Sequence, residues 1–104
     1  MNGSALITGA ATRIGKEIAL GLAALGNNIV VHYMSSQEEA EQVVQEARLY
    51  GVQAESIKAD LLNDNEVSGL ISRASALIGS PLNILVNNAS IFEYDNIETA
   101  SIES

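Results

Sequence analysis

The sequence predicts an α/β fold with a doubly wound parallel sheet. Short apolar runs alternate with longer stretches whose apolar residues recur at helical spacing, and glycines follow these stretches. Parallel strands need crossover connections, which are usually helices that cover both faces of the sheet. The 104 residues, 47% hydrophobic and 17% charged, suffice for one domain with a buried core.

The first part of the chain predicts two strands that flank a helix. The first strand is expected at 4–8, and a β-branched run at 28–33 predicts the second. Between them the apolar period is helical up to Gly26, a residue typical of a helix C-terminus. The apolar residues expected to face the core share one side of this helix: Ile14, Ile18, Leu22 and Leu25.

The pattern of helix followed by strand then occurs twice more. Ser36 with Glu39, and Asn63 with Glu66, have the spacing of a capping box, so a helix is expected to begin after each. Their apolar stripes are Ala40, Val43, Val44 and Ala47 in one helix, and Val67, Leu70, Ile71, Ala74, Leu77 and Ile78 in the other. The expected helix ends are Gly51 and Gly79, and the expected strands are 52–58 and 82–86.

Composition narrows the classes of function. The net charge of -8, from 13 acidic and five basic residues, argues against a nucleic-acid or anionic-membrane surface. There is no Cys and one histidine, His32, so disulfides, thiolate catalysis and metal sites with several Cys or His ligands are excluded. Without an apolar leader or a membrane-length apolar run, the expected location is the cytoplasm.

Positive charge is concentrated near the start of the chain. Residues 1–32 hold Arg13 and Lys16 against Glu17, a net charge of +1, whereas residues 33–104 hold three bases and 12 acids, a net charge of -9. An acidic protein with its foremost cations in one short segment is expected to bind an anion there.

The turn after the first strand, Thr8 to Gly15, predicts a phosphate-binding loop. Small residues allow a ligand to approach the backbone, and the amides at the start of a helix favour an anion. The alternative is a glycine turn that serves packing alone. Five residues separate Gly9 from Gly15, and Glu17 follows Lys16, so the turn is not a Walker A loop; nor does it have the G-x-G-x-x-G spacing.

Three motifs in order resemble the short-chain dehydrogenase/reductase family. They are T-G-x-x-x-R-I-G at 8–15, Asp60-Leu61 after the third strand, and N-N-A-S at 87–90, where most members have N-N-A-G. The resemblance implies a Rossmann-type sheet of order 3-2-1-4, truncated after its fourth strand. It also implies that 1–104 is the N-terminal part of a single dinucleotide-binding domain.

The motifs are most similar to those of the pteridine reductase branch. That branch resembles this chain in Arg13, in the His-Tyr-x-x-Ser stretch at 32–36 and in N-N-A-S-x-F at 87–92. One departure is Ser35, where the branch usually has a basic residue. His32 and Tyr33 are expected to be packing residues at the end of the strand.

The end of the second strand predicts NADP(H) rather than NAD as the cofactor. NAD-preferring folds place an acid there, whereas the first acid here is Glu38, already within a helix. Arg13 and the hydroxyls of Ser35 and Ser36 would attract a 2′-phosphate. The alternatives are that Arg13 is a surface cation and Ser36 a helix cap.

The resemblance implies roles for further residues. Gly9, Ile14 and Gly15 would belong to the phosphate turn, Asp60 would receive the adenine amino group and Leu61 would lie beside the adenine. Asn87 to Ala89 would line the ribose, Ser90 would reach a phosphate and Phe92 would stack on a substrate. The alternatives are that Asp60 caps its loop, that the asparagines satisfy strand-end carbonyls, and that Phe92 is a core residue.

The catalytic Tyr-x-x-x-Lys pair of the family is not found among the three tyrosines, Tyr33, Tyr50 and Tyr94. We therefore expect the cofactor part of an oxidoreductase that transfers hydride between NADPH and a small carbonyl or pteridine-like substrate, with this chain inactive by itself. The alternative is a non-catalytic dinucleotide-binding or interaction module. The fourth strand would be an open apolar edge, which predicts homo-oligomers or aggregation.

Overall fold

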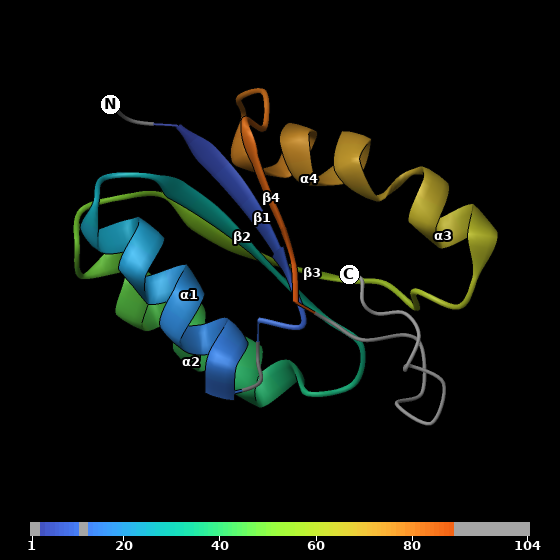
Figure 1. Ribbon diagram of the computed structural model, residues 1–104, viewed down its shortest axis with the longest axis horizontal. Coiled ribbons are helices and arrows are strands. Elements are labelled where there is room, and N and C mark those ends of the chain that lie inside the picture. The colour runs from blue at the N-terminus through green and yellow to red at the C-terminus, as the bar shows by residue number, and fades with distance from the viewer. Residues whose placement is uncertain (1–2, 11–12, 89–104) are drawn as a thin grey trace, which may run out of the picture.

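The fold is seen in a computed structural model that describes residues 3–10 and 13–88. Four parallel strands form one sheet of order β3-β2-β1-β4, as the sequence predicted (Figure 1). The strands are β1 (Ser4–Thr8), β2 (Asn28–Tyr33), β3 (Ala54–Lys58) and β4 (Ile84–Asn87). The helices are α1 (Arg13–Ala24), α2 (Gln37–Arg48), α3 (Asp64–Ser68) and α4 (Leu70–Ile78).

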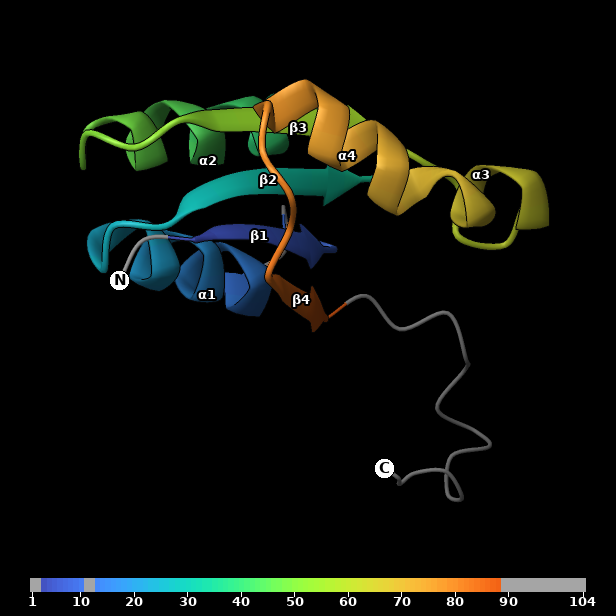
Figure 2. The same cartoon turned by 90° about the horizontal axis from the view of Figure 1, so that it is seen from above.

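Helices cover the two faces of the sheet unequally. Figures 1 and 2 show α1 and α2 on one face and α3 and α4 on the other. The α1/α2 face has the larger core, built on Ile7, Ile29 and Val31 of the sheet. The α3/α4 face has a smaller core, in which Leu6 and Val30 contact α4 residues. The alternation of strand side chains explains why neighbouring residues of β1 lie in different cores.

The buried side of α1 differs from the predicted one. Gly15, Ala19 and Ala23 are its buried residues, whereas Ile14 is 65% exposed and Leu25, just after the helix, is 72% exposed. Small residues at intervals of four allow α1 to lie close to the sheet, and Ile18 and Leu22 pack at the side of this contact. The prediction from large apolar residues therefore identified the edge of the buried surface of α1 and missed the small residues at the middle of that surface.

The predicted stripe of α2 is buried throughout, but its predicted cap is absent. Ser36 is the N-cap residue, and its side chain makes no capping hydrogen bond. At α3 the Asn63 side chain does accept hydrogen bonds from the Asn65 and Glu66 amides. The Glu66 carboxylate accepts from Asp60 N–H instead of from Asn63, so neither predicted capping box forms as a reciprocal pair.

The helix predicted before β4 is interrupted at Gly69, which separates α3 from α4. Gly79 ends α4 in the left-handed conformation expected of a C-terminal glycine, with φ of 78°. Among residues 3–10 and 13–88, no helix has both the length and the apolar character that crossing a membrane requires.

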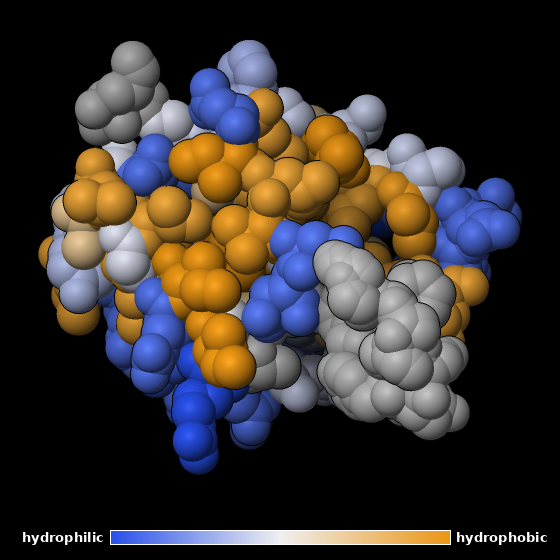
Figure 3. Space-filling model, in the orientation of Figure 1, coloured by the Kyte–Doolittle hydropathy of each residue, from blue (hydrophilic) through white to orange (hydrophobic). Residues whose placement is uncertain are grey.

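β4 is an edge strand, as predicted, and only one of its faces is covered. Ile84 and Val86 pack against the α1/α2 core, whereas Leu85 is 57% exposed on the opposite face. Within the described part of the chain, α4 packs across β1, β2 and β3 and not over β4. Figure 3 shows apolar surface gathered on this side of the molecule, where β4 lies in front.

Candidate functional site

The predicted site residues gather at the carboxyl ends of the strands. The chain leaves β1 through α1 toward β2, whereas the segment after β3 crosses to the other side of β1 to form β4. This reversal makes the boundary of β1 and β4 a topological switch point, which is where open α/β sheets bind ligands. The glycine turn and the asparagine pair both begin at this point.

Gly9 and Gly15 are required by the geometry of the turn. Gly9 has φ of 64°, in the left-handed region that favours glycine. A Cβ on Gly15 would lie 2.3 Å from the Gly9 carbonyl oxygen and 2.7 Å from the Ala10 Cα. No side chain fits at that distance, so the start of α1 is held directly against the turn.

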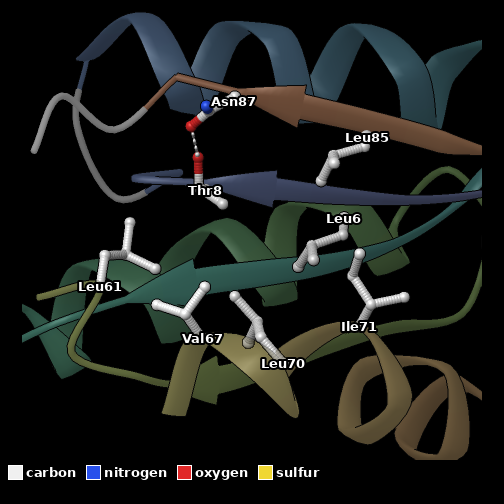
Figure 4. Close-up of a pocket in the computed structure, with 8 residues that line it drawn as sticks. All are labelled: Leu6, Thr8, Leu61, Val67, Leu70, Ile71, Leu85 and Asn87. Atoms are coloured by element: carbon white, nitrogen blue, oxygen red, sulfur yellow. Dashed lines mark hydrogen bonds between the residues drawn. The ribbon is translucent and has the colours of Figure 1, made fainter. Parts of the chain in front are cut away.

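Asparagines from the end of β4 connect this strand to the turn. The Asn88 side chain donates from Nδ2 to the Gly9 carbonyl, with a distance of 3.1 Å. Thr8 Oγ1 donates to Asn87 Oδ1 at 3.2 Å, the bond drawn in Figure 4. Asn88 thus satisfies a backbone carbonyl, which was the alternative considered from the sequence. Contact of Asn87 with a ribose stays a prediction.

His32 holds the turn from the β2 side, a contact that the sequence analysis missed. Its Nδ1 accepts from Gly9 N–H at 3.0 Å, and its Nε2 lies 2.8 Å from the Ala59 carbonyl oxygen. The side chain is buried, as expected of a packing residue. Burial lowers the pKa of the imidazole below its ordinary value, and the bond to Ala59 opposes part of this shift. The signal available in the sequence was a histidine next to the last residue of a β-branched strand.

The two cations at the start of α1 differ in their partners. Lys16 Nζ lies 3.1 Å from a carboxylate oxygen of Glu46 on α2. Arg13, the first residue of α1, is exposed and makes no ion pair with the residues that the structure describes. Ser36, the N-cap residue of α2 three residues after β2, is also exposed. Among the described residues, Arg13 forms no ion pair and the Ser36 hydroxyl forms no helix cap, so both keep polar groups available at this edge.

Asp60 caps its own loop. Its Oδ1 accepts from Leu62 N–H at 3.0 Å, and its amide donates to Glu66 Oε1 at 2.7 Å. The loop-capping alternative is therefore confirmed, and recognition of adenine by Asp60 stays a prediction. Leu61 follows directly and is half-buried.

An open apolar groove of about 190 Å³ lies beside the switch point, between β4 and the helices α3 and α4. Figure 4 shows its side chains converging from the sheet on one side and from α3 and α4 on the other. The groove is lined by Leu6, Thr8, Leu61, Val67, Leu70, Ile71, Leu85 and Asn87. Of the predicted site residues, it brings together Leu61 and Asn87.

Three predicted site residues, Ala89, Ser90 and Phe92, lie outside the described residues. Within the described ranges, no group of three His, Asp or Glu side chains could hold a metal ion.

Comparison with known proteins agrees with this geometry. The family model described as short chain dehydrogenase matches residues 4–104. The 3-oxoacyl-(acyl-carrier-protein) reductase FabG of Staphylococcus epidermidis is 43% identical over 97 residues, which are 93% of this chain and 39% of FabG. The chain thus spans about two-fifths of that relative.

Two further relatives differ in length. The short-chain dehydrogenase/reductase homolog YusS of Bacillus subtilis is 38% identical over 104 residues, which cover 97% of this chain and 94% of YusS. The crystal structure of FolM alternative dihydrofolate reductase 1 from Brucella canis, complexed with NADP, superposes with a TM-score of 0.79 at 40% identity. That match covers 88% of this chain and 36% of FolM. With the glycine turn, the strand order and these matches in agreement, the chain belongs to the short-chain dehydrogenase/reductase family.

Proposed function

We propose that this chain forms the NADP(H)-binding part of a short-chain oxidoreductase. The observation that carries the proposal is the glycine turn, which is closed against an α1 N-terminus that has Arg13 and no acid in its first turn. The turn and the first amides of α1 would hold the pyrophosphate, with Gly9, Ile14 and Gly15 as the contacting residues. The N-terminus of the neighbouring helix α2 is less suited to the pyrophosphate than that of α1, because Glu38 and Glu39 lie in its first turn.

The 2′-phosphate of NADP(H) would lie between Arg13 and Ser36. Both residues are exposed at the carboxyl edge of the sheet, and the Ser36 hydroxyl is not used as a helix cap. A guanidinium and a hydroxyl are suitable donors for a phosphate, so the donor set is consistent with the group. The NADP complex of the FolM relative supports this choice, and NAD is the less favoured cofactor.

Asp60, Leu61 and Asn87 would contact the adenosine, and Ala89 and Ser90 would extend the same site. Bound NADPH would supply the hydride, and a small carbonyl or pteridine-like compound would accept it. FabG is named as a reductase of a 3-oxoacyl group, a carbonyl substrate, and FolM as a reductase of dihydrofolate, a pteridine-like substrate. The similarity of the motifs to the pteridine reductase branch favours a pteridine-like substrate. Phe92 is the proposed substrate contact. No described residue is placed as a catalytic group, so the chain alone is expected to be inactive.

A second candidate is a non-catalytic module that binds a dinucleotide or a partner protein. The observation that favours it is YusS, a relative whose length this chain covers almost entirely. Sequencing the gene beyond the codon for Ser104 distinguishes the two: a reading frame that continues to a Tyr-x-x-x-Lys pair would decide for the enzyme part, and a stop codon would decide for the module. Binding of NADPH by the chain without its oxidation agrees with both candidates.

The partner proposed for the chain itself is a second copy. β4 is an edge strand, and it leaves Leu85 exposed beside the apolar groove. Exposed apolar strand edges recruit other chains, so homo-oligomers are the expected assembly.

The cofactor proposal is tested with Arg13→Ala and with Lys16→Ala as the matched control. Both variants remove one positive charge from the first turns of α1, but Lys16 is already paired with Glu46. We expect Arg13→Ala to weaken NADPH binding by about tenfold or more, because charge-assisted bonds to phosphate are strong. The same variant should change NADH binding much less, since NADH lacks the 2′-phosphate.

Isothermal titration calorimetry of both dinucleotides with both variants provides the measurement. Equal losses for NADPH and NADH with Arg13→Ala would overturn the assignment of the 2′-phosphate. Equal losses of NADPH affinity in Arg13→Ala and Lys16→Ala would mean that Arg13 acts only through the net charge of this region and does not contact the 2′-phosphate.

A further inference from the structure

The imidazole of His32 lies between two backbone groups that belong to different parts of the proposed site. Its Nδ1 meets the amide of Gly9 in the glycine turn, and its Nε2 meets the carbonyl of Ala59, which precedes Asp60. The His32 carbonyl also accepts from Ala10 N–H at 3.1 Å. Side chain and backbone of one residue therefore hold two consecutive amides of the turn.

These partners permit only one protonation state of the ring. An amide N–H donates, so Nδ1 must be unprotonated; a carbonyl accepts, so Nε2 must carry the hydrogen. The ring is therefore the neutral Nε2–H tautomer. A proton on Nδ1 would oppose the Gly9 N–H with a second donor and break the bond that orients this amide.

The surroundings offer the protonated ring no compensation. Both polar partners of the ring within the described residues are backbone groups, and the side chain is only 2% exposed. The charged side chains carried at the adjoining ends of α1, β3 and α3 have other contacts or are exposed. Arg13 and Lys58 are exposed, Asp60 accepts from the Leu62 amide, and Glu66 accepts from the Asp60 amide.

We propose that His32 is a positioning residue for the dinucleotide: its neutral imidazole orients the Gly9 amide and couples the glycine turn to the loop that contains Asp60, so that protonation loosens binding. This inference rests on the proposed function, because the turn and the Asp60 loop are the parts assigned to pyrophosphate and adenine. The direction of the pH effect follows from burial, which lowers the pKa of His32. Neutral pH keeps the turn in order, and acidification below the ordinary histidine value disturbs it.

Two substitutions separate the hydrogen bond from the space that the ring fills. In His32→Asn the amide oxygen stands near the position of Nδ1 and accepts from Gly9, but it does not titrate. In His32→Leu the acceptor is lost and the site stays apolar and filled. We expect His32→Leu to weaken NADPH binding at pH 7.5 by about tenfold, the effect of losing one buried hydrogen bond. His32→Asn should stay within about threefold of the unchanged chain, on the same scale.

The pH profile is the measurement that a purely structural residue would not change. NADPH affinity is measured for the unchanged chain and for His32→Asn from pH 5 to 8, and the ratio of the two is taken at each pH. The 2′-phosphate itself titrates near pH 6, and this effect cancels in the ratio. On acidification we expect the affinity of the unchanged chain to fall more than that of His32→Asn, so the ratio of the former to the latter should decrease. A ratio that is constant across this range, or full affinity in His32→Leu, would overturn the proposal.

Nuclear magnetic resonance of the chain without dinucleotide tests the positioning role independently. Long-range proton–nitrogen spectra at pH 7.5 should show Nε2 protonated and Nδ1 unprotonated. The Gly9 amide signal should move with the titration of His32 and should not move over that range in His32→Asn. A ring protonated at Nδ1, or a Gly9 signal indifferent to that titration, contradicts the coupling. If neither the unchanged chain nor any variant binds a dinucleotide, the proposed function is wrong. The spectra would then still test whether His32 is coupled to the Gly9 amide.

Discussion

The two faces of the sheet are closed to different extents, and the difference separates two kinds of surface. On the α1/α2 face, small residues of α1 and the buried stripe of α2 close the core over β1, β2 and β3, and Ile84 and Val86 of β4 pack against its side. On the α3/α4 face, α4 covers three strands and leaves Leu85 of β4 exposed beside the groove. The closed face holds the start of α1 close to Gly9 and Ala10, whereas the open face offers apolar surface to another element or chain.

The largest effect that would test this contrast is expected at the glycines of α1. Gly15→Ala should lower the free energy of unfolding by about 2–3 kcal/mol, because its Cβ would overlap backbone of the turn. Gly21, on the exposed side of the same helix, has no atom within 4 Å of a built Cβ. Gly21→Ala should therefore raise the free energy of unfolding by about 0.5–1 kcal/mol through helix propensity.

Urea unfolding followed by circular dichroism measures both glycine variants. If Gly15→Ala were as stable as Gly21→Ala, close packing of α1 against the turn would be wrong.

A smaller effect is expected from two consecutive residues of β4. Val86 packs against the closed core and Leu85 faces the open groove. Val86→Ser should lower the free energy of unfolding by about 1–2 kcal/mol, since it loses buried apolar area. Leu85→Ser should change the same quantity by no more than about 0.5 kcal/mol. Thermal unfolding at low protein concentration makes the comparison, and equal losses would mean that both faces of β4 are covered.

The smallest effect on stability, and the clearest effect on assembly, is expected from Leu85→Lys. A lysine at an exposed strand edge opposes pairing with another chain. Sedimentation velocity over a concentration series should show association in the unchanged chain and less of it in the variant. A chain that stays monomeric throughout the series would argue against the edge as a docking surface.

The positions of the strands and helices were predictable from the sequence because the hydrophobic period and the glycine turns are local signals. The order of the strands in the sheet was predicted only through the resemblance to the family. Gly26, Gly51 and Gly79, the expected helix ends, all have the positive φ typical of a glycine that follows a helix. The buried side of α1 was not predictable by counting large residues, since tight packing against a sheet selects Gly15, Ala19 and Ala23 for being small.

The site was predictable only where a local motif carries the geometry. The turn from Gly9 to Gly15 is such a motif. The contacts of His32 with Gly9 and Ala59 and of Asn88 with Gly9 join residues that lie far apart in the chain. Side-chain bonds of this kind depend on the register of neighbouring strands, which no single segment encodes.

The small residues of α1 also set how far the helix lies from the sheet. A change near the C-terminus of the helix therefore affects the distance between its N-terminus and the glycine turn. From Gly15 to Ala23 the helix rises by about 12 Å, and over this length it behaves as a stiff rod against the sheet. A bulkier side chain at Ala23 would tilt the rod and move its first amides away from Gly9. The geometry of the proposed pyrophosphate site thus depends on residues of α1 that would not contact the ligand, and substitutions at Ala19 and Ala23 are expected to change dinucleotide affinity.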